Sequence, residues 1–245
     1  DRKSVVSLAY LSRLKIFPPR NFCMKLFDII GPVMIGPSSS HTAGAVKIGL
    51  VARKLLGETP VKANIKLHGS FAMTGAGHGT DRAIVAGLLG IRPDDERIPD
   101  SFDIAHKEGF SFDIDTTHIP NAHPNSTLLT LEGDHGRKLE IVASSLGGGR
   151  ILVSRIDGIT TNFSGDENTL IVHTHYDRPG HVALVTAALA KQGINIATMQ
   201  LYRRSKGGQA VMVIECDDPI PPELVEKLTR MEGILKVTYL NQEKK

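Results

Sequence analysis

A short run of hydroxyl side chains around one histidine is the part of this sequence best suited to chemistry. Residues 36–44 read Gly-Pro-Ser-Ser-Ser-His-Thr-Ala-Gly, and the run 42–56 has the pattern of an amphipathic helix. A helix N-terminus is partly positive and its first N–H groups are unpaired, so nearby hydroxyl donors complete a site for a carboxylate or phosphate. His41 would lie beside that anion and transfer protons near neutral pH. The alternative is an ordinary helix cap beside a solvated histidine. The hydroxyl groups in question belong to Ser38, Ser39, Ser40 and Thr42.

Two further segments combine a histidine with small polar residues. His78, Gly79, Thr80 and Asp81 repeat the first arrangement, with a histidine in a glycine-rich stretch followed by a hydroxyl and a carboxylate at an expected helix start. The alternative for His78 is a mobile surface loop. His123-Pro124-Asn125 is the third candidate, although the neighbouring His118 competes with His123 for the functional role. Residues 145–149, Ser-Leu-Gly-Gly-Gly, suit close approach to a ligand or partner, or a plain strand connection.

Periodicity and turn residues predict the elements that would position these side chains. We expect a strand within 61–73, a flexible loop at 75–80 and a helix over 81–89 capped by Thr80 or Asp81. A solvated loop at 93–99, a helix at 101–108 and a strand at 110–115 should follow. Two hairpins complete this part, with strands at 127–131 and 138–143 and then at 151–156 and 159–163.

The last third of the chain has a clear alternation of strand and helix patterns. After a linker at 164–168, the expected strands are 169–175, 194–203, 209–216 and 235–240, and the expected helices are 180–191 and 222–231. The order βαββαβ is that of a ferredoxin-like module. The sequence therefore predicts an α+β protein with two domains, 24–163 and 168–245.

Composition narrows the class of protein. The chain has 245 residues and 41% apolar content, enough for one large core or two smaller ones. Cys23 and Cys216 are the only cysteines, which indicates a reducing cytoplasm and excludes a disulfide scaffold. Two thiols are also too few to hold an iron–sulfur cluster, which takes three or four. We therefore expect no metal site in this chain.

The net charge of +3 comes from one end of the sequence. Residues 1–23 hold five basic groups and one acidic group, which leaves 24 basic and 25 acidic groups for the rest. Nucleic-acid binding is therefore not indicated. Met24 follows directly, so we interpret 1–23 as an artificial addition or an over-long start, with a transit peptide as the alternative.

Residues 26–44, which end in the Ser-Ser-Ser-His-Thr motif, resemble the opening of the iron–sulfur-dependent bacterial L-serine dehydratases. The likeness is to the β subunit of the two-subunit form and extends to the C-terminus. It implies α,β-elimination of water from L-serine, giving aminoacrylate and then pyruvate and ammonia. It also implies that the Ser-Ser-Ser-His-Thr, His-Gly-Thr-Asp and His-Pro-Asn motifs face the active site.

The resemblance implies roles for these residues and for a partner. His78 or His123 would be the general base, and His41 with the serines would orient the substrate carboxylate. Thr80, Asp81 and Asn125 would contribute to substrate binding. The [4Fe–4S] cluster would polarise the departing hydroxyl and would be held by a cysteine-rich α subunit, so that this chain is half an enzyme.

The segments Asp-Arg-Pro-Gly (177–180) and Gly-Ile-Asn-Ile (193–196) resemble those of an ACT domain, a small module that commonly binds amino acids. The resemblance implies an effector site at His175, Asp177, Gly180 and Asn195, together with a homodimer contact through this domain. Asp177 stands where an amide is usual, and its carboxylate would suit an ammonium group. The alternative is a domain that only dimerises.

A competing function is that of a non-catalytic module that binds an amino acid or anion. The first domain also resembles the allosteric substrate-binding domain of some phosphoglycerate dehydrogenases, which carry an ACT domain as well. The pairing of His78 and His123 with the Ser-Ser-Ser-His motif favours catalysis, because an anion site needs no such histidines.

Overall fold

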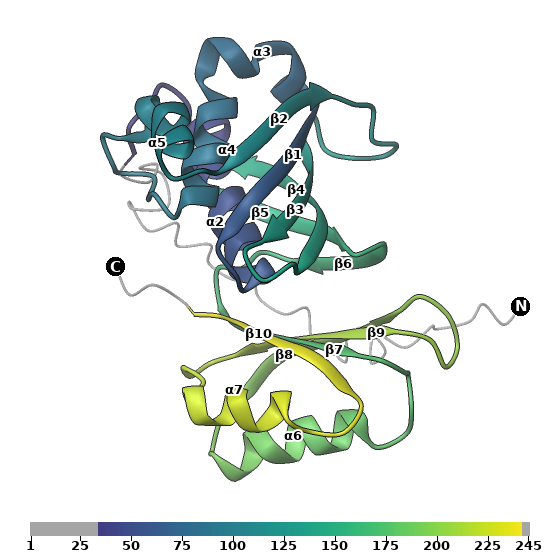
Figure 1. The fold of residues 1–245 in the computed structure, drawn as a ribbon. Helices are drawn as coiled ribbons and strands as arrows, with labels where there is room; N and C mark the ends of the chain where they lie inside the picture. Colours follow the sequence, from purple (N-terminus) through teal and green to yellow (C-terminus); the bar gives the residue numbers. More distant parts are fainter. Residues whose placement is uncertain (1–33, 242–245) are drawn as a thin grey trace, which may run out of the picture. The chain divides into compact units, whose positions relative to one another are not determined.

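The structure is a computed structural model, and it describes residues 34–241 (Figure 1). The predicted N-terminal extension 1–23, with Cys23, and the first part of the 26–44 motif lie outside the described residues. None of the helices in the described part of the chain is long and apolar enough to cross a membrane.

A mixed six-stranded sheet forms the centre of the N-terminal half. Its order is β2-β1-β3-β4-β5-β6, and only β1 and β2 run parallel. The two predicted hairpins are confirmed as β3–β4 and β5–β6, and the second turns at Asp157-Gly158 with positive φ at both residues. The strands are β1 (Pro60–Gly69), β2 (Ser111–Thr116), β3 (Asn125–Gly133), β4 (Lys138–Gly147), β5 (Arg150–Ile156) and β6 (Ile159–Phe163).

The helices of this half confirm most of the sequence prediction and correct it in one place. The elements are a π-helical turn η2 (Ser39–Ala43), α2 (Gly44–Leu56), α3 (Ser70–His78), α4 (Thr80–Leu89), a 3-10 turn η3 (Ile98–Asp100) and α5 (Ser101–Lys107). The strand expected within 61–73 is confirmed as β1, which ends at Gly69, whereas the loop expected at 75–80 is mostly the helix α3.

Tertiary packing explains why α3 forms despite its glycines. The fully buried side chain of Phe71 anchors the first turn of the helix, while Gly69 has a φ of 57° and lets the chain leave the strand sharply. The expected helix cap by Thr80 or Asp81 is also wrong. Gly79, at a φ of 67°, is the cap residue of α4, and no side chain caps it.

Helices α2 and α4 cross at a pair of glycines. A Cβ added to Gly87 would lie 2.1 Å from the carbonyl oxygen of Val46, and one added to Gly49 would lie 2.4 Å from that of Ile84. Only glycine allows the two backbones to approach this closely. Because α2 and α4 each begin just after one of the histidine motifs, this crossing fixes where those motifs lie relative to each other.

The C-terminal part has the predicted βαββαβ order and a four-stranded antiparallel sheet in the order β10-β7-β9-β8. Its elements are β7 (Asn168–Thr174), α6 (His181–Lys191), β8 (Ile196–Arg203), β9 (Ala210–Cys216), α7 (Pro222–Thr229) and β10 (Ile234–Leu240). Figure 1 shows α6 and α7 together on one face of this sheet. This is the expected ferredoxin-like arrangement.

The two faces of the four-stranded sheet belong to different apolar clusters. Leu170 and Val172 of β7 pack with α6 and α7. Ile171, between them, belongs to the large cluster that also contains the core of the six-stranded sheet. Side chains point alternately to the two faces of a strand, and both faces of β7 are covered by apolar side chains. Every residue of β7 is therefore buried. Val211, Val213 and Leu240 join Ile171 in the large cluster.

Candidate active site

His41 lies in a cage of four hydroxyl groups. Its Nδ1 is 3.1 Å from Ser40 Oγ and 3.4 Å from Ser38 Oγ, and its Nε2 is 3.1 Å from Ser70 Oγ and 3.0 Å from Thr74 Oγ1. Ser38 also caps the π-helical turn by accepting a hydrogen bond from the backbone N–H of His41. Both ring nitrogens are thus held by hydroxyls, which accept or donate as the tautomer requires.

Burial keeps His41 neutral at physiological pH. Removal from water lowers the pKa of His41, and the nearby His78 lowers it further by charge repulsion. The interaction with Ser70 acts in the opposite direction and is smaller. The rings of His41 and His78 are 5.1 Å apart between centroids, and the edge of Phe71 closes another side at 5.3 Å. The site therefore contains two adjacent imidazoles, one enclosed and one exposed to solvent.

Three buried hydroxyls near these motifs have no hydrogen-bond partner among the described residues. They are the Oγ1 atoms of Thr42 and Thr80 and the Oγ atom of Ser145. A Cβ added to Gly44, the first residue of α2, would lie 2.1 Å from Ser145 Oγ, so β4 contacts the helix start directly. An unsatisfied buried hydroxyl costs about 1–3 kcal/mol, and a bound substrate would give it a partner.

The glycine-rich end of β4 flanks the same motif. The backbone N–H of Gly148 donates to Ser39 Oγ over 3.3 Å. Of the two interpretations of residues 145–149, the structure shows the strand connection between β4 and β5, and this connection lies against the hydroxyl motif. Gly147, Gly148 and Gly149 all have positive φ, which permits this turn.

The His-Pro-Asn loop contacts the site through its backbone. The carbonyl oxygen of Pro124 accepts the N–H of Ser70 over 2.8 Å, and Ser70 is one of the four hydroxyls around His41. His123 is exposed, and its Nδ1 accepts the backbone N–H of Asn125 over 3.1 Å. In the neutral form, this fixes the proton of His123 on Nε2.

Most of the predicted substrate-site residues thus lie on elements that meet around His41. Asp81 is half-buried, and its carboxylate accepts the backbone N–H of Arg82. His118 instead contacts His68, at 5.4 Å between ring centroids. Among the described residues, no contact joins His118 to the hydroxyl cage. The structure therefore gives no support to His118 as the functional histidine in place of His123.

Two members of the cage were missed by sequence reasoning. Ser70 and Thr74 lie four residues apart on α3, on one face of the helix, and Thr74 Oγ1 also donates to the carbonyl oxygen of Ser70. The signal that could have found them is this spacing directly after a strand. It was hidden because no helix was expected between the strand within 61–73 and the loop at 75–80.

The predicted effector residues do not come together within one chain. Asp177 forms an ion pair with Arg203 over 2.6 Å, close to the end of β7 that carries His175, and Gly180 precedes α6. Asn195 lies at the opposite end of the sheet, where Ile196 pairs with Cys216, and its side chain donates to Asp217 over 2.6 Å. A site that includes all four residues needs more than one copy of the chain.

Comparison with known protein families gives two matches. Residues 25–109 match the family model described as "Serine dehydratase beta chain", and residues 168–233 match the model described as "ACT domain". The second match covers the four-stranded sheet and its helices.

Similar proteins of known name agree with these matches. The chain is 41% identical to the "Probable L-serine dehydratase, beta chain" of Bacillus subtilis over 88% of its own length and 97% of that protein. It is 35% identical to the "L-serine dehydratase, beta chain" of Peptoniphilus asaccharolyticus over 87% of its length and 96% of that protein. It is also 27% identical to the D-3-phosphoglycerate dehydrogenase of Archaeoglobus fulgidus, over 80% of its length but only 37% of that protein.

Proposed function

Because the chain belongs to the family of serine dehydratase β chains, we propose that it is the β subunit of an L-serine dehydratase, a lyase that converts L-serine to pyruvate and ammonia. The observation that carries the proposal is the His41 cage beside His78, with three buried hydroxyls that lack partners. The match to β chains over nearly their full length favours this function over the non-catalytic module.

We propose that the hydroxyl cage binds the carboxylate of L-serine. Ser38, Ser39 and Ser40 lie at the start of the helical run that continues into α2, where unpaired N–H groups and the helix dipole favour an anion. His41 acts as a neutral hydrogen-bonding group that fixes the orientation of these hydroxyls. Thr42, Thr80, Asp81 and Asn125 belong to the same substrate site in this proposal.

We propose His78 as the general base. Its imidazole is exposed to solvent and lies against neutral His41, so it can accept the Cα proton of the substrate. His123 carries its proton on Nε2 when neutral, which suits donation to the substrate or to the departing hydroxyl rather than proton removal. The Cα–H and Cβ–O bonds break, water leaves, and 2-aminoacrylate remains, which hydrolyses to pyruvate and ammonia.

The thiols of this chain do not fit an iron–sulfur cluster. Cys216 is the free cysteine of the described part, buried among apolar side chains, and burial raises its pKa to about 11. The second cysteine of the sequence, Cys23, cannot complete a set of three or four. We propose that a [4Fe–4S] cluster, which would supply Lewis acidity at the departing hydroxyl, is held by the α subunit that the β-chain family implies. The cysteine count also supports the predicted cytoplasmic location.

Reconstitution with the α subunit under anaerobic conditions tests the proposal. The chain alone should form no pyruvate from L-serine, and the pair should do so. His78→Ala should lower kcat by roughly 10²–10⁴-fold, as expected for loss of a general base. The His118→Ala variant is the matched control and should retain near-wild-type turnover. Equal losses in both variants, or none in either, would refute the assignment.

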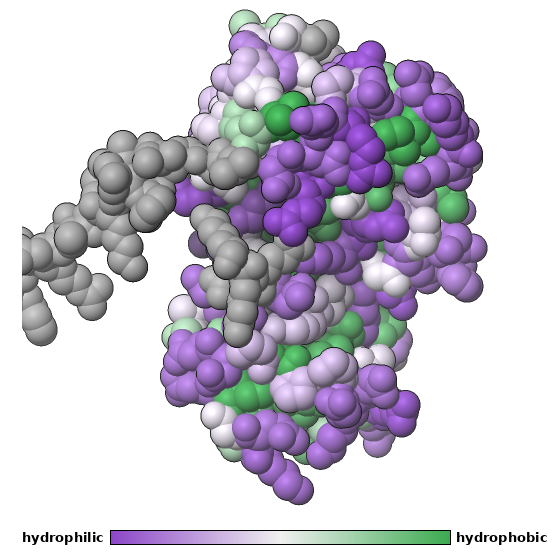
Figure 2. All heavy atoms as spheres, turned by 90° about the vertical axis from the view of Figure 1, so that its left-hand side faces the viewer, coloured by the Kyte–Doolittle hydropathy of each residue, from purple (hydrophilic) through white to green (hydrophobic). Residues whose placement is uncertain are grey.

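For the C-terminal part we propose an ACT domain at 168–245 that follows a catalytic β domain at 24–163, and a homodimer contact through the ACT domain. Strand β8 is a sheet edge, and a groove of about 470 Å³ lies beside it. Helix α6 has a single residue of the types Asp, Glu, Lys and Arg, which is Lys191. The residue Leu184 on this helix is 52% exposed to solvent. Figure 2 shows apolar side chains at the surface in the lower part of the view, which holds the four-stranded sheet. Small residues, two isoleucines and one amide line the groove: Ala183, Thr186, Ala187, Ala190, Ile194, Asn195 and Ile196.

Such a contact would complete the effector site. If two β8 edges pair antiparallel about a two-fold axis, Asn195 of one copy comes to the sheet end that carries the Asp177–Arg203 ion pair of the other. Asp177 and Arg203 would then offer opposite charges to the ammonium and carboxylate of an amino acid. Calorimetric titration of the full chain with L-serine tests this, since Asp177→Ala and Asn195→Ala should each abolish the binding event at the ACT domain and leave binding at the hydroxyl cage unchanged. Loss of neither would leave dimerisation as the role of this domain.

A further inference from the structure

A second polar site lies at the C-terminal end of helix α2, the end opposite to the His41 motif. It is a cavity of about 400 Å³ lined by residues of α2 and its cap, the β3–β4 turn and strand β10. Three of the lining residues are cations, namely Lys54, Arg137 and Lys236, and the others are Gly57, Val237, Thr238, Tyr239 and Asn241. Among the described residues, 34–241, none of those that line the cavity is acidic.

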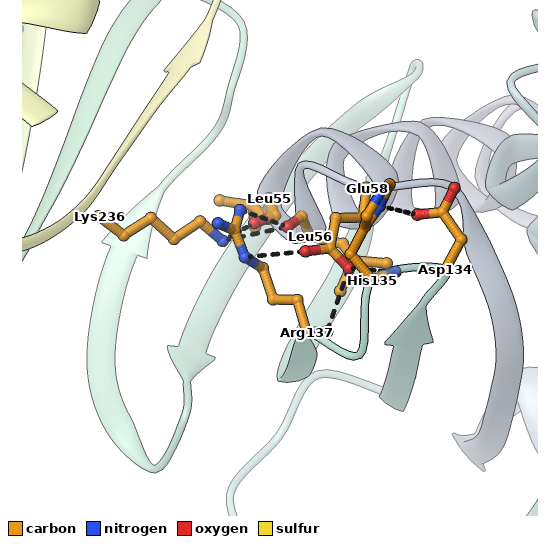
Figure 3. Close-up of polar contacts among 7 residues, drawn as sticks. All are labelled: Leu55, Leu56, Glu58, Asp134, His135, Arg137 and Lys236. Atoms are coloured by element: carbon orange, nitrogen blue, oxygen red, sulfur yellow. Dashed lines mark hydrogen bonds and ion pairs between the residues drawn. The ribbon is translucent and has the colours of Figure 1, made fainter.

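The cations at this cavity are held in place by the end of the helix. Figure 3 shows Lys236 of β10 and Arg137 of the β3–β4 turn reaching the last carbonyl groups of α2. Lys236 Nζ donates to the carbonyl oxygens of Leu55 and Leu56, and Arg137 Nη1 donates to that of Leu56 over 3.0 Å. Lys54 Nζ donates to the Asn241 side chain over 3.2 Å. The positive charges are therefore positioned before anything binds.

The carboxylate of Glu58 is hydrogen-bonded to the turn beside this cavity. Glu58 Oε2 accepts the backbone N–H groups of His135 and Arg137, and its Oε1 lies 3.6 Å from Arg137 Nε. Burial lowers the pKa of Lys236 to about 8, and repulsion by Arg137 contributes, whereas Asp157 and Glu58 act more weakly in the opposite direction. Lys236 is therefore held by helix carbonyl oxygens, and the two carboxylates act on it only weakly.

The side chain of Thr238 gives an independent indication that the cavity binds a ligand. It is 93% buried, at 7% exposure, and its Oγ1 has no hydrogen-bond partner among the described residues. It follows Lys236 by two positions on β10, so both side chains are on the same face of the sheet. A hydroxyl in this position is a ready donor to an oxyanion.

We propose that this cavity binds a small anion bearing a phosphate group. Two or three fixed cations, a hydroxyl and an amide are the donors that such a dianion requires, and the volume admits a metabolite rather than a polymer. The site is separate from the proposed serine site, and its test is a binding measurement that does not depend on catalysis.

Titration of the full chain with inorganic phosphate at constant ionic strength tests the proposal, by calorimetry and by the rise in Tm. We expect saturable binding, with Arg137→Gln and Lys236→Met each raising Kd by about tenfold or more. Exposed cations serve as matched controls, and Arg230→Gln and Lys191→Met should leave Kd unchanged.

Thr238→Val keeps the proposal falsifiable if Lys236→Met fails to fold. This nearly isosteric change removes an unpartnered hydroxyl, so the free chain should melt at the same temperature or higher, while Kd for phosphate rises severalfold. The absence of saturable binding by the wild-type chain at tens of millimolar phosphate would overturn the proposal. So would a Kd that Arg137→Gln and Thr238→Val both leave unchanged.

Discussion

The close crossing of α2 and α4 gives a quantitative prediction for Gly87→Ala. The added Cβ would meet the Val46 carbonyl oxygen at 2.1 Å and the Cα of Gly49 at 2.9 Å, whereas Cβ contacts under 3.0 Å are essentially never seen. The helices must therefore separate by about 1 Å in a closely packed interior. Overpacking of this kind costs about 1–3 kcal/mol, and the higher helix propensity of alanine offsets about 1 kcal/mol.

Stability and activity should respond together. A net loss of up to about 2 kcal/mol lowers Tm by up to roughly 8 °C in a chain of this size. Because α2 and α4 begin at the two halves of the site, a shift of about 1 Å should also lower kcat/KM by about 10²-fold in the reconstituted enzyme. Thermal melting and the pyruvate assay measure both effects.

The control for stability is Gly77→Ala in α3. A Cβ at Gly77 would have no atom within 4 Å, so the variant should melt at the same temperature as wild type or up to a few degrees higher. If Gly87→Ala melts like Gly77→Ala and retains turnover within twofold, the close contact between the helices does not position the site.

Three further predictions concern a titrating group, the cage and the dimer. Burial, with a smaller contribution from Lys236, lowers the pKa of His173 to about 4, so the unfolded chain binds more protons between pH 4 and 6.5. The free energy of unfolding should therefore fall by about 2 kcal/mol from pH 7.5 to pH 5 on account of this residue. The His173→Gln variant, measured by urea unfolding, should lose that part of the pH dependence. A free energy of unfolding that depends on pH as in the wild type would contradict the prediction. Thr74→Val removes one of the hydroxyls that contact His41, and it should raise KM for L-serine about fivefold to tenfold while kcat stays within twofold of the wild-type value. A fall in kcat alone would show instead that His41 acts in the chemical step. Leu201→Lys on the β8 edge, where this side chain is 45% exposed, should give a monomer by analytical ultracentrifugation, and an intact dimer would place the contact elsewhere.

The parts of the fold predicted correctly are those with strong local signals. Asp157-Gly158 requires positive φ at both turn residues, and the flanking alternation of apolar residues specified the β5–β6 hairpin within a residue. The βαββαβ order followed in the same way from turns and periodicity. Helix α3 was missed because its nine residues include two glycines, Gly75 and Gly77, which have low helix propensity, and only the burial of Phe71 shows why the helix forms.

The candidate site was predictable in its motifs and not in its geometry. The sequence indicated His41, His78 and the three serines because hydroxyls and imidazoles adjoin expected helix starts. It did not indicate Ser70 and Thr74, whose contacts with His41 depend on the turn at Gly69 that brings α3 over the motif. Nor could spacing reveal that Asn195 lies at the far end of its sheet from Asp177, since that depends on strand order.

The apolar face that β7, β9 and β10 share with the larger cluster affects how the protein unfolds and whether its two parts can dissociate. Ile171, Val211, Val213 and Leu240 would all become exposed if the last third of the chain were separated from the rest. Cleavage in the connection at 164–167 should therefore leave the two pieces associated, and heat should unfold residues 34–241 in a single cooperative transition. A ligand bound to the ACT domain would then protect the serine site against unfolding as well, without any change of shape between them.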